Sequence, residues 1–435
     1  MDASQQTFNE ELIEFLKCST TPFHAVECMS VSLEKAGFKR LFEADSWQGL
    51  SAGKYYVCRN DSSIIAFNKA ENEVTESGFK MVGAHTDSPC LKIKPNPEIS
   101  EHSYYQLGVE VYGGALLNPW FDRDLSIAGR VTYKTSDDEL VSRLIDFEKA
   151  IATIPSLAIH LDREANTSRT INAQTDLPPL ILQLPTEKTL DFRDLLLEFI
   201  KAESPATDAM QVLDYELSLY DTQPAAIVGF HHDFISAARL DNLLSCFVGL
   251  KALLESDKTQ NTLLVCNDHE EVGSTSAAGA QGPFLKSVLE RMTDSAESLS
   301  RCIDRSMMIS ADNAHGVHPN FSSKHDENHG PILNKGPVIK INANQRYATN
   351  SETSSLFRHI CDIADVPVQS FVVRSDMACG STIGPITASE LGVKTIDVGV
   401  PTFAMHSIRE TAGTWDAYYL FRALRVYFSE KITKT

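Results

Sequence analysis

Two adjacent glutamates, Glu270 and Glu271, follow the apolar run 262–266, which predicts a buried strand. Open α/β sheets carry their chemistry just beyond the carboxyl ends of their strands, so this position favours a functional site. One carboxylate of such a pair can bind a metal ion while the other moves protons. The alternative is a solvated acidic loop before the next helix, and the pair alone does not exclude it.

Candidate metal ligands occur at other predicted strand ends or in the loops that follow them. The set comprises two imidazoles and three carboxylates: His85, Asp241, Glu271, Asp312 and His406. These ligand types suit two divalent ions, zinc first, with cobalt or manganese as alternatives. Two such ions, about 3.5–4 Å apart, need a bridging carboxylate and leave a water position open for catalysis. A structural zinc site would require thiolates, which this set does not offer.

Asp87 follows His85 by two residues, so in an extended chain both side chains lie on the same side. Its carboxylate can hold the imidazole nitrogen that does not face a metal. Taken singly, each of these residues has an ordinary explanation. Either histidine could be a loop or core residue, and Asp241 before Asn242 resembles a helix cap. The occurrence of all these residues in order along one chain is what favours a metal site over these ordinary explanations.

The elements that must position these residues fall into two separated parts of the chain. Residues 7–37 carry a helical apolar pattern, with a break before Pro22 at the start of a second helix. Apolar runs predict strands at 54–58, 63–67 and 79–84, and the last of these leads into His85. The αβ alternation returns at residue 231 and closes with a predicted helix over 412–428.

Residues 93–230 have a different character, with short alternating segments separated by turn residues. We therefore expect an α/β fold in which this β-rich domain is inserted into a discontinuous catalytic domain, residues 1–92 and 231–435. No internal repeat interrupts this organisation.

Composition limits the classes of partner. The chain has 435 residues, 43% of them hydrophobic, and a formal charge of −19, which argues against nucleic acid or an anionic membrane. An acidic ligand would need a local cation. The start of the chain does not resemble a secretory signal, and no apolar run approaches a membrane span. Nine cysteines without a Cys-x-x-Cys pattern predict reduced thiols and a cytoplasmic location.

Seven segments together resemble the M18 metallopeptidases, or aspartyl aminopeptidases. They occur in family order: GAHTDSP (83–89), SAARLDN (236–242), HEEVGS (269–274), SADNAH (310–315), GPVIK (336–340), QRYA (345–348) and AMHSIRE (404–410). The resemblance covers nearly the whole chain, and no ligand or base position departs from the family pattern. It implies a zinc-peptidase-like α/β/α sandwich with a mixed central sheet, in addition to the inserted domain.

The resemblance also implies a role for each residue. Asp241 would bridge two zinc ions, with His85 and Asp312 completing one site, and Glu271 and His406 completing the other. Glu270 would be the general base, which takes a proton from the attacking water and delivers it to the leaving amine.

Family members prefer peptides that begin with Asp or Glu, and the resemblance places Lys340 and Tyr347 in the pocket for that first side chain. Without it, a solvated lysine at a strand end would be the preferred explanation of Lys340. His160, in the inserted domain, matches a histidine that reaches a neighbouring subunit's active site, whereas the residues around it alone suggest a packed side chain. His315 lies three residues after Asp312, close enough to approach the site.

The sequence thus predicts a metal-dependent aminopeptidase that removes unblocked N-terminal acidic residues from peptides. The resemblance further implies a tetrahedral homododecamer, with the inserted domain mediating dimer contacts and access. Alternatives are a related metallopeptidase with another first-residue preference, a carboxypeptidase or amidohydrolase of this fold, and a non-catalytic peptide-binding or assembly protein.

Overall fold

The computed structural model describes residues 3–184, 190–256 and 259–430. Its contacts divide the chain into two compact units. The first comprises residues 1–88, 225–405 and 410–435. The second comprises residues 89–224 and 406–409. His406 therefore belongs to the second unit, whereas the sequence had grouped it with the catalytic domain.

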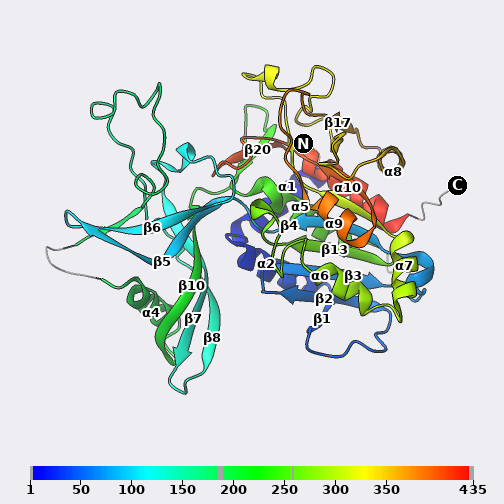
Figure 1. The fold of residues 1–435 in the computed structure, drawn as a ribbon, viewed down its shortest axis with the longest axis horizontal. Coiled ribbons are helices and arrows are strands. Elements are labelled where there is room, and N and C mark those ends of the chain that lie inside the picture. Colours follow the sequence, from blue (N-terminus) through cyan, green and yellow to red (C-terminus); the bar gives the residue numbers. More distant parts are fainter. Residues whose placement is uncertain (1–2, 185–189, 257–258, 431–435) are drawn as a thin grey trace. The chain divides into compact units, whose positions relative to one another are not determined.

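A mixed sheet forms the centre of the first unit (Figure 1). Within the described residues its strand order is β1 (Lys39–Arg40), β2 (Gly53–Arg59), β3 (Ser63–Lys69), β13 (Thr262–Asn267), β4 (Lys80–His85), β14 (Met307–Ala311), β18 (Lys394–Gly399), β16 (Val338–Lys340) and β17 (Gln369–Phe371). The middle strands β13, β4, β14 and β18 are parallel to one another. β3 and β16 flank them in antiparallel orientation. The predicted α/β class with a mixed sheet is confirmed.

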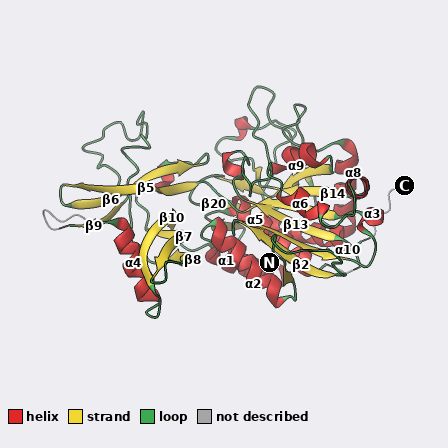
Figure 2. Cartoon of the chain, turned by 60° about the horizontal axis from the view of Figure 1, so that its bottom comes forward, coloured by secondary structure: helices red, strands yellow, loops and turns green. Residues whose placement is uncertain are grey.

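Helices cover both faces of this sheet (Figure 2). The larger hydrophobic core joins one face to α1 (Ala3–Cys18), α2 (Pro22–Lys35), α5 (Leu240–Leu254), α8 (Ser351–Ala364) and α10 (Asp416–Ser429). A separate core on the opposite face joins α6 (Phe284–Glu290), α7 (Ala296–Asp304) and α9 (Ile383–Leu391), near the short α3 (Val74–Ser77). Leu12 on α1 and Met29 on α2 are fully buried, as their helical spacing requires.

A smaller sheet in the same unit corrects one prediction. It comprises β11 (Ala226–Val228), β12 (Phe234–Ala237), β20 (Glu410–Gly413), β19 (Pro401–Phe403) and β15 (Ala314–His315). The helix predicted over 412–428 begins only at Asp416, because the residues before it pair with β12, with Ala237 opposite Glu410. This partner strand is remote in sequence, so helical periodicity could not reveal it.

The turn between α1 and α2 corrects another prediction. Cys18, the last residue of α1, forms a disulfide with Cys28 in α2, with the Cα atoms 6.4 Å apart. The expectation of reduced thiols is wrong for this pair. The tight turn at residues 19–21 brings the two helices together, and no cysteine motif marks that approach. The described free cysteines are Cys58, Cys90, Cys246, Cys266, Cys302, Cys361 and Cys379.

The second unit is built on an antiparallel sheet. Its strand order is β8 (Leu140–Asp146), β7 (Leu125–Thr135), β10 (Ala209–Asp221), β5 (Cys90–Glu101), β6 (Tyr104–Tyr112) and β9 (Leu180–Gln183). α4 (Phe192–Glu203) packs on it through Phe192, Leu196 and Ile200, which recur every four residues. This unit has its own hydrophobic core. No described helix of either unit has the length and apolar character needed to span a membrane.

Candidate active site

Three neighbouring parallel strands deliver their following residues to one edge of the central sheet. β4 ends at His85, β13 ends just before Glu270 and Glu271, and β14 ends just before Asp312. Because β13 pairs with β4, and β4 with β14, all in parallel, their carboxyl ends meet at the same edge. Apolar strand interiors therefore fix the position of the polar residues that follow them.

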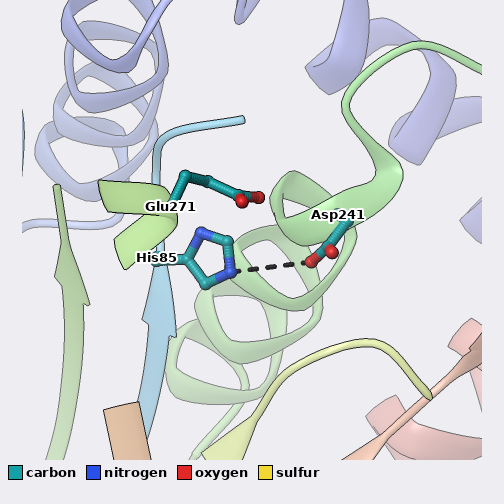
Figure 3. A group of neighbouring side chains, drawn as sticks. All are labelled: His85, Asp241 and Glu271. Carbon is teal, nitrogen blue, oxygen red and sulfur yellow. Dashed lines mark ion pairs between the residues drawn. The ribbon is translucent and has the colours of Figure 1, made fainter. Parts of the chain in front are cut away.

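His85 lies at the centre of an acidic cluster. Its Nε2 lies 3.5 Å from Oδ1 of Asp241, 3.6 Å from Oδ1 of Asp312 and 3.9 Å from Oε2 of Glu270. Donor atoms of His85, Asp241 and Glu271 all lie within 4.8 Å of one another (Figure 3). The structure thus brings together four of the five predicted metal ligands and the predicted base, all within the first unit.

Asp87 contacts both the His85 ring and the backbone that carries the two glutamates. Its Oδ1 lies 3.3 Å from Nδ1 of His85, on the side of the ring away from the cluster, and its backbone oxygen lies 3.1 Å from the same nitrogen. Its carboxylate also accepts the backbone N–H groups of Glu270 and Glu271, each at 3.1 Å. One buried side chain therefore orients the imidazole and the segment that carries both glutamates. The contact with His85 was expected, and the contacts with the glutamates were not.

The backbone N–H and the backbone carbonyl oxygen of Asp241 are both hydrogen-bonded. Its N–H donates to Oε2 of the buried Glu410 at 2.9 Å, and its carbonyl oxygen accepts from the hydroxyl of Ser88. Its ψ of 104° is not helical, although it falls within the limits of α5. The side chain faces His85 rather than simply capping a helix (Figure 3).

Arg239 anchors the same loop to the N-terminal helices. It has a left-handed backbone (φ 59°), and its guanidinium donates to the carbonyl oxygens of Leu16 and Ser19 at 3.3 and 3.0 Å. Sequence reasoning did not identify Arg239, Ser88 or Glu410 as site residues. All three lie inside the segments that carry the family resemblance, and that is the only signal in the sequence that could have marked them.

Burial of several carboxylates in one cluster costs free energy unless a cation compensates their charge. It raises the pKa of Glu270 to about 7 and, with repulsion from Asp241, raises that of Glu271 to about 10. Burial lowers the pKa of His85, but hydrogen bonds to Asp241 and Asp312 outweigh it, so the pKa lies well above its usual value. Converging carboxylates with one imidazole are donors suited to a divalent metal, so the residues present fit such an ion.

Lys340, at the end of β16, is 2% exposed. Its Nζ lies 3.1 Å from Oδ2 of Asp312 and 3.0 Å from the carbonyl oxygen of Asn313, and it sits 5.3 Å from the ring centre of Tyr347. The alternative of a solvated lysine is wrong, because the strand end that carries Lys340 is covered. Its charge is held against one of the predicted metal ligands.

A pocket of about 300 Å³ opens in the first unit, and the Tyr347 ring that Lys340 contacts is part of its lining. His315 and Tyr347 line it, together with Lys324, His325 and Phe371. His315 lies on β15, and its side chain is exposed toward the pocket while protein atoms surround the rest of the ring. This loss of hydration, followed by repulsion from Lys340, lowers its pKa, and the carboxylates of Asp312 and Asp241 act in the opposite direction. The pocket therefore adjoins the acidic cluster.

Two predicted residues lie in the second unit. Nδ1 of His406 lies 3.2 Å from the carbonyl oxygen of Gly114, and His406 has a left-handed backbone (φ 68°). His160 is exposed on a turn, so the explanation that it is simply packed among apolar residues is wrong. Its neighbours Leu157, Ile159 and Leu161 are exposed as well. The roles of both histidines stay predictions.

Comparisons with known proteins identify the family and the fold. Residues 15–428 match the family profile described as "Aminopeptidase I zinc metalloprotease (M18)". A "Probable M18 family aminopeptidase 2" from Pseudomonas aeruginosa (strain UCBPP-PA14) is 61% identical over 97% of this chain and 98% of its own. The chain also resembles the solved Ape4–Nbr1 complex, with 38% identity, a TM-score of 0.94 and coverage of 98% and 86% of the two chains. An Ape1 dodecamer from S. cerevisiae gives 28% identity, a TM-score of 0.85 and coverage of 98% and 97%.

Proposed function

The chain belongs to the M18 family of zinc aminopeptidases, and from this membership we propose that it removes unblocked N-terminal Asp or Glu from peptides. The observation that carries the proposal is the convergence of His85, Asp241 and Glu271 beside Glu270. Zinc ions held there would polarise the scissile carbonyl and lower the pKa of water. The cytoplasmic location inferred from the sequence is part of the proposal.

Glu270 serves as the general base in this proposal. Its carboxylate lies 3.9 Å from Nε2 of His85, at the edge of the ligand cluster, where it would accept a proton from water and release it to the leaving amine. Asp87 orients the backbone of Glu270 and the ring of His85, so the base and a metal ligand share one support. His85, Asp241, Glu271 and Asp312 would hold the ions, and His406 stays a predicted further ligand.

The acidic preference rests on the pocket beside the cluster. The first side chain of the substrate would enter it between His315 and Tyr347, above the buried charge of Lys340. A cation there compensates locally for the net charge of −19, which repels acidic peptides at long range.

Assembly into a homo-oligomer is a further part of the proposal. The relative from S. cerevisiae is a dodecamer. In this chain, the exposed apolar side chains of Leu157, Ile159 and Leu161 surround His160, as expected of a surface that another subunit covers. His160 would then act at a neighbouring subunit's site.

A panel of aminoacyl reporters tests the proposal. Protein stripped with a strong chelator and reloaded with zinc should cleave Asp and Glu reporters faster than Ala or Lys reporters, and should not cleave N-acetylated ones. Equal rates on all reporters with a free N-terminus would refute the acidic preference but would still support an aminopeptidase activity. Cleavage of the acetylated reporters would refute the requirement for a free N-terminus.

A further inference from the structure

The disulfide between Cys18 and Cys28 is accessible to small molecules in the first unit. Cys18 is exposed and Cys28 is half-buried, and both line a pocket of about 510 Å³ beside α1, α2 and α5. Exposed disulfides exchange with thiols, whereas buried cysteines are inert. A small thiol or a small disulfide can therefore react with this pair.

The disulfide closes the turn that connects α1 to α2. Ser19, Thr20 and Thr21 in this turn are buried, and Thr21 caps α2 by accepting the backbone N–H of His24. The crosslinked residues are only 10 apart in the sequence, so the bond restricts the separation of the two helices. The position of α1 is thus more narrowly defined when the pair is oxidised.

Arg239 connects this turn to the acidic cluster. Its guanidinium donates to the carbonyl oxygens of Leu16 and Ser19, which lie on either side of Cys18. Arg239 precedes Asp241 by two residues, and Asp241 is one of the predicted metal ligands that contact His85. A shift of the end of α1 therefore changes the hydrogen bonds that hold the loop before Asp241.

The first turns of α1 contact a second segment that supports Asp241. The buried side chains of Gln5 and Asn9 donate to the carbonyl oxygen of Thr414, at 2.8 and 3.0 Å. Thr414 directly follows β20, whose Glu410 accepts the backbone N–H of Asp241. One helix thus contacts the segments that fix Asp241 from two directions.

We propose that the Cys18–Cys28 pair is a thiol–disulfide switch that controls zinc affinity at the acidic cluster, through α1 and Arg239. This inference rests on the proposed zinc aminopeptidase function and adds regulation to the same site. In the oxidised form α1 is fixed, the loop before Asp241 is preorganised and zinc binds more tightly. In the reduced form α1 has more freedom, and zinc binds less tightly.

The exchange needs only a small-molecule disulfide as oxidant. The thiolate of Cys18, the more exposed partner, attacks one sulfur of that disulfide, breaks its S–S bond and releases one thiol. The thiolate of Cys28 then attacks Sγ of Cys18 and releases the second thiol. Two electrons and two protons thus pass from the pair to the oxidant. A cytoplasm rich in thiols keeps such a pair reduced, so the oxidant is the signal at the proposed location.

Zinc affinity of the full-length protein, measured in a chelator buffer that fixes free zinc, tests the switch. Oxidised parental protein should bind zinc at least about 5-fold more tightly than Cys28→Ser, which cannot form the crosslink. Reduced parental protein should match Cys28→Ser. The matched control is Cys58→Ser, which changes a half-buried free thiol and should keep the affinity of the oxidised parent. Equal affinity in oxidised and reduced parental protein would refute the switch.

Thermodynamic linkage gives a readout that general damage to the fold cannot imitate. If the disulfide tightens zinc binding by a given factor, saturating zinc must favour the disulfide by the same factor. Zinc should therefore raise, by that factor, the ratio of reduced to oxidised dithiothreitol that half-reduces the pair. Alkylation of Cys18, followed by mass spectrometry, measures this ratio while the chelator buffer fixes free zinc. An unchanged ratio would refute the switch.

Arg239→Gln tests the route between the disulfide and the cluster. A shorter amide cannot reach both carbonyl oxygens, so the difference in zinc affinity between oxidised and reduced protein should shrink. An undiminished difference would overturn the route through Arg239. Failure of the switch leaves the aminopeptidase proposal in place, because the reporter panel tests that activity on oxidised, zinc-loaded protein. If that protein cleaves no reporter, the proposed function fails, whereas zinc affinity still reports on the switch.

Discussion

The ammonium of Lys340 lies 3.1 Å from Oδ2 of Asp312, with both side chains inside the protein. This contact joins the residue that the family resemblance assigns to the substrate pocket to a predicted metal ligand. A buried ion pair is sensitive to the loss of one partner, because the remaining charge keeps its desolvation cost. A substitution of Lys340 should therefore disturb the position of Asp312 in the cluster as well as the charge near the pocket.

Lys340→Met should lower kcat/KM at least about 10-fold for the Ala reporter, because Asp312 loses the group that orients it, and more for the Asp reporter, because the pocket also loses its proposed cation. Steady-state kinetics on zinc-loaded protein measures this, and the surface variant Lys335→Met is the control. A defect confined to the Asp reporter would show that Lys340 acts only on the substrate's side chain and does not orient Asp312.

Glu270→Gln should keep the fold and the bound metal and lower kcat about 10²- to 10⁴-fold, because it removes the proton carrier and leaves the ligands in place. Metal content by elemental analysis and turnover of an Asp reporter are the two measurements. The adjacent variant Glu271→Gln is the contrast and should lose metal as well. Parental turnover in Glu270→Gln would show that another group is the base.

Glu410→Ala should weaken zinc affinity about 10- to 100-fold, because the backbone N–H of Asp241 loses the carboxylate that fixes it. Glu410→Gln keeps an acceptor oxygen and should recover most of the affinity. Calorimetric zinc titration of the folded variants makes the measurement.

A matched control for Glu410 is Asn261→Ala. The Asn261 side chain is also buried and accepts a backbone N–H, from Ala70 at 2.7 Å, but it precedes β13, at the end of that strand opposite to the glutamates. It should reduce thermal stability without changing zinc affinity. Equal zinc affinity in Glu410→Ala and Asn261→Ala would show that Glu410 supports the fold and not zinc binding.

Asp416 should make stability depend on pH. Burial raises its folded-state pKa to about 7, although it accepts hydrogen bonds from the N–H groups of Asn334 and Gly336. The folded state thus holds a proton that the unfolded state releases near its ordinary pKa. The stabilisation is complete below pH 3.8 and is lost as pH rises through 7, by up to about 1.4 kcal/mol per pH unit.

The isosteric variant Asp416→Asn should therefore flatten the decline in melting temperature between pH 5 and pH 8, a window chosen to span about pH 7. Asp362→Asn, which changes an exposed carboxylate on α8, is the control and should retain the parental slope. An unchanged slope in Asp416→Asn would mean that Asp416 stays ionised in the folded protein throughout this range.

The central strands and the residues that follow them could be predicted because local pattern determines both. The runs that became β4, β13 and β14 are apolar, and His85, Glu271 and Asp312 come directly or soon after them. Parallel pairing then gathers these ends at one edge, a general property of such sheets. For this part of the site, the order of residues in the chain was sufficient.

The support around Asp241 could not be predicted, because it depends on pairing between remote segments. Glu410 reaches the Asp241 backbone because β20 pairs with β12, whereas local periodicity predicted a helix starting at residue 412. Burial of Lys340 and the disulfide between Cys18 and Cys28 likewise follow from tertiary packing. Residue type alone favours an exposed lysine and, without a motif, reduced thiols.

The four predicted ligands of the first unit come from segments on both sides of the 89–224 stretch, so the cluster joins parts of the chain that are remote in sequence. Contacts of this kind form late in folding, since long loops must close before they are made. Few of the contacts that bring the predicted zinc ligands together would then be present in the folding transition state. We expect bound zinc to slow unfolding strongly and to change the refolding rate little. Stopped-flow unfolding with and without zinc measures both rates, and faster refolding with zinc would show that the cluster forms early.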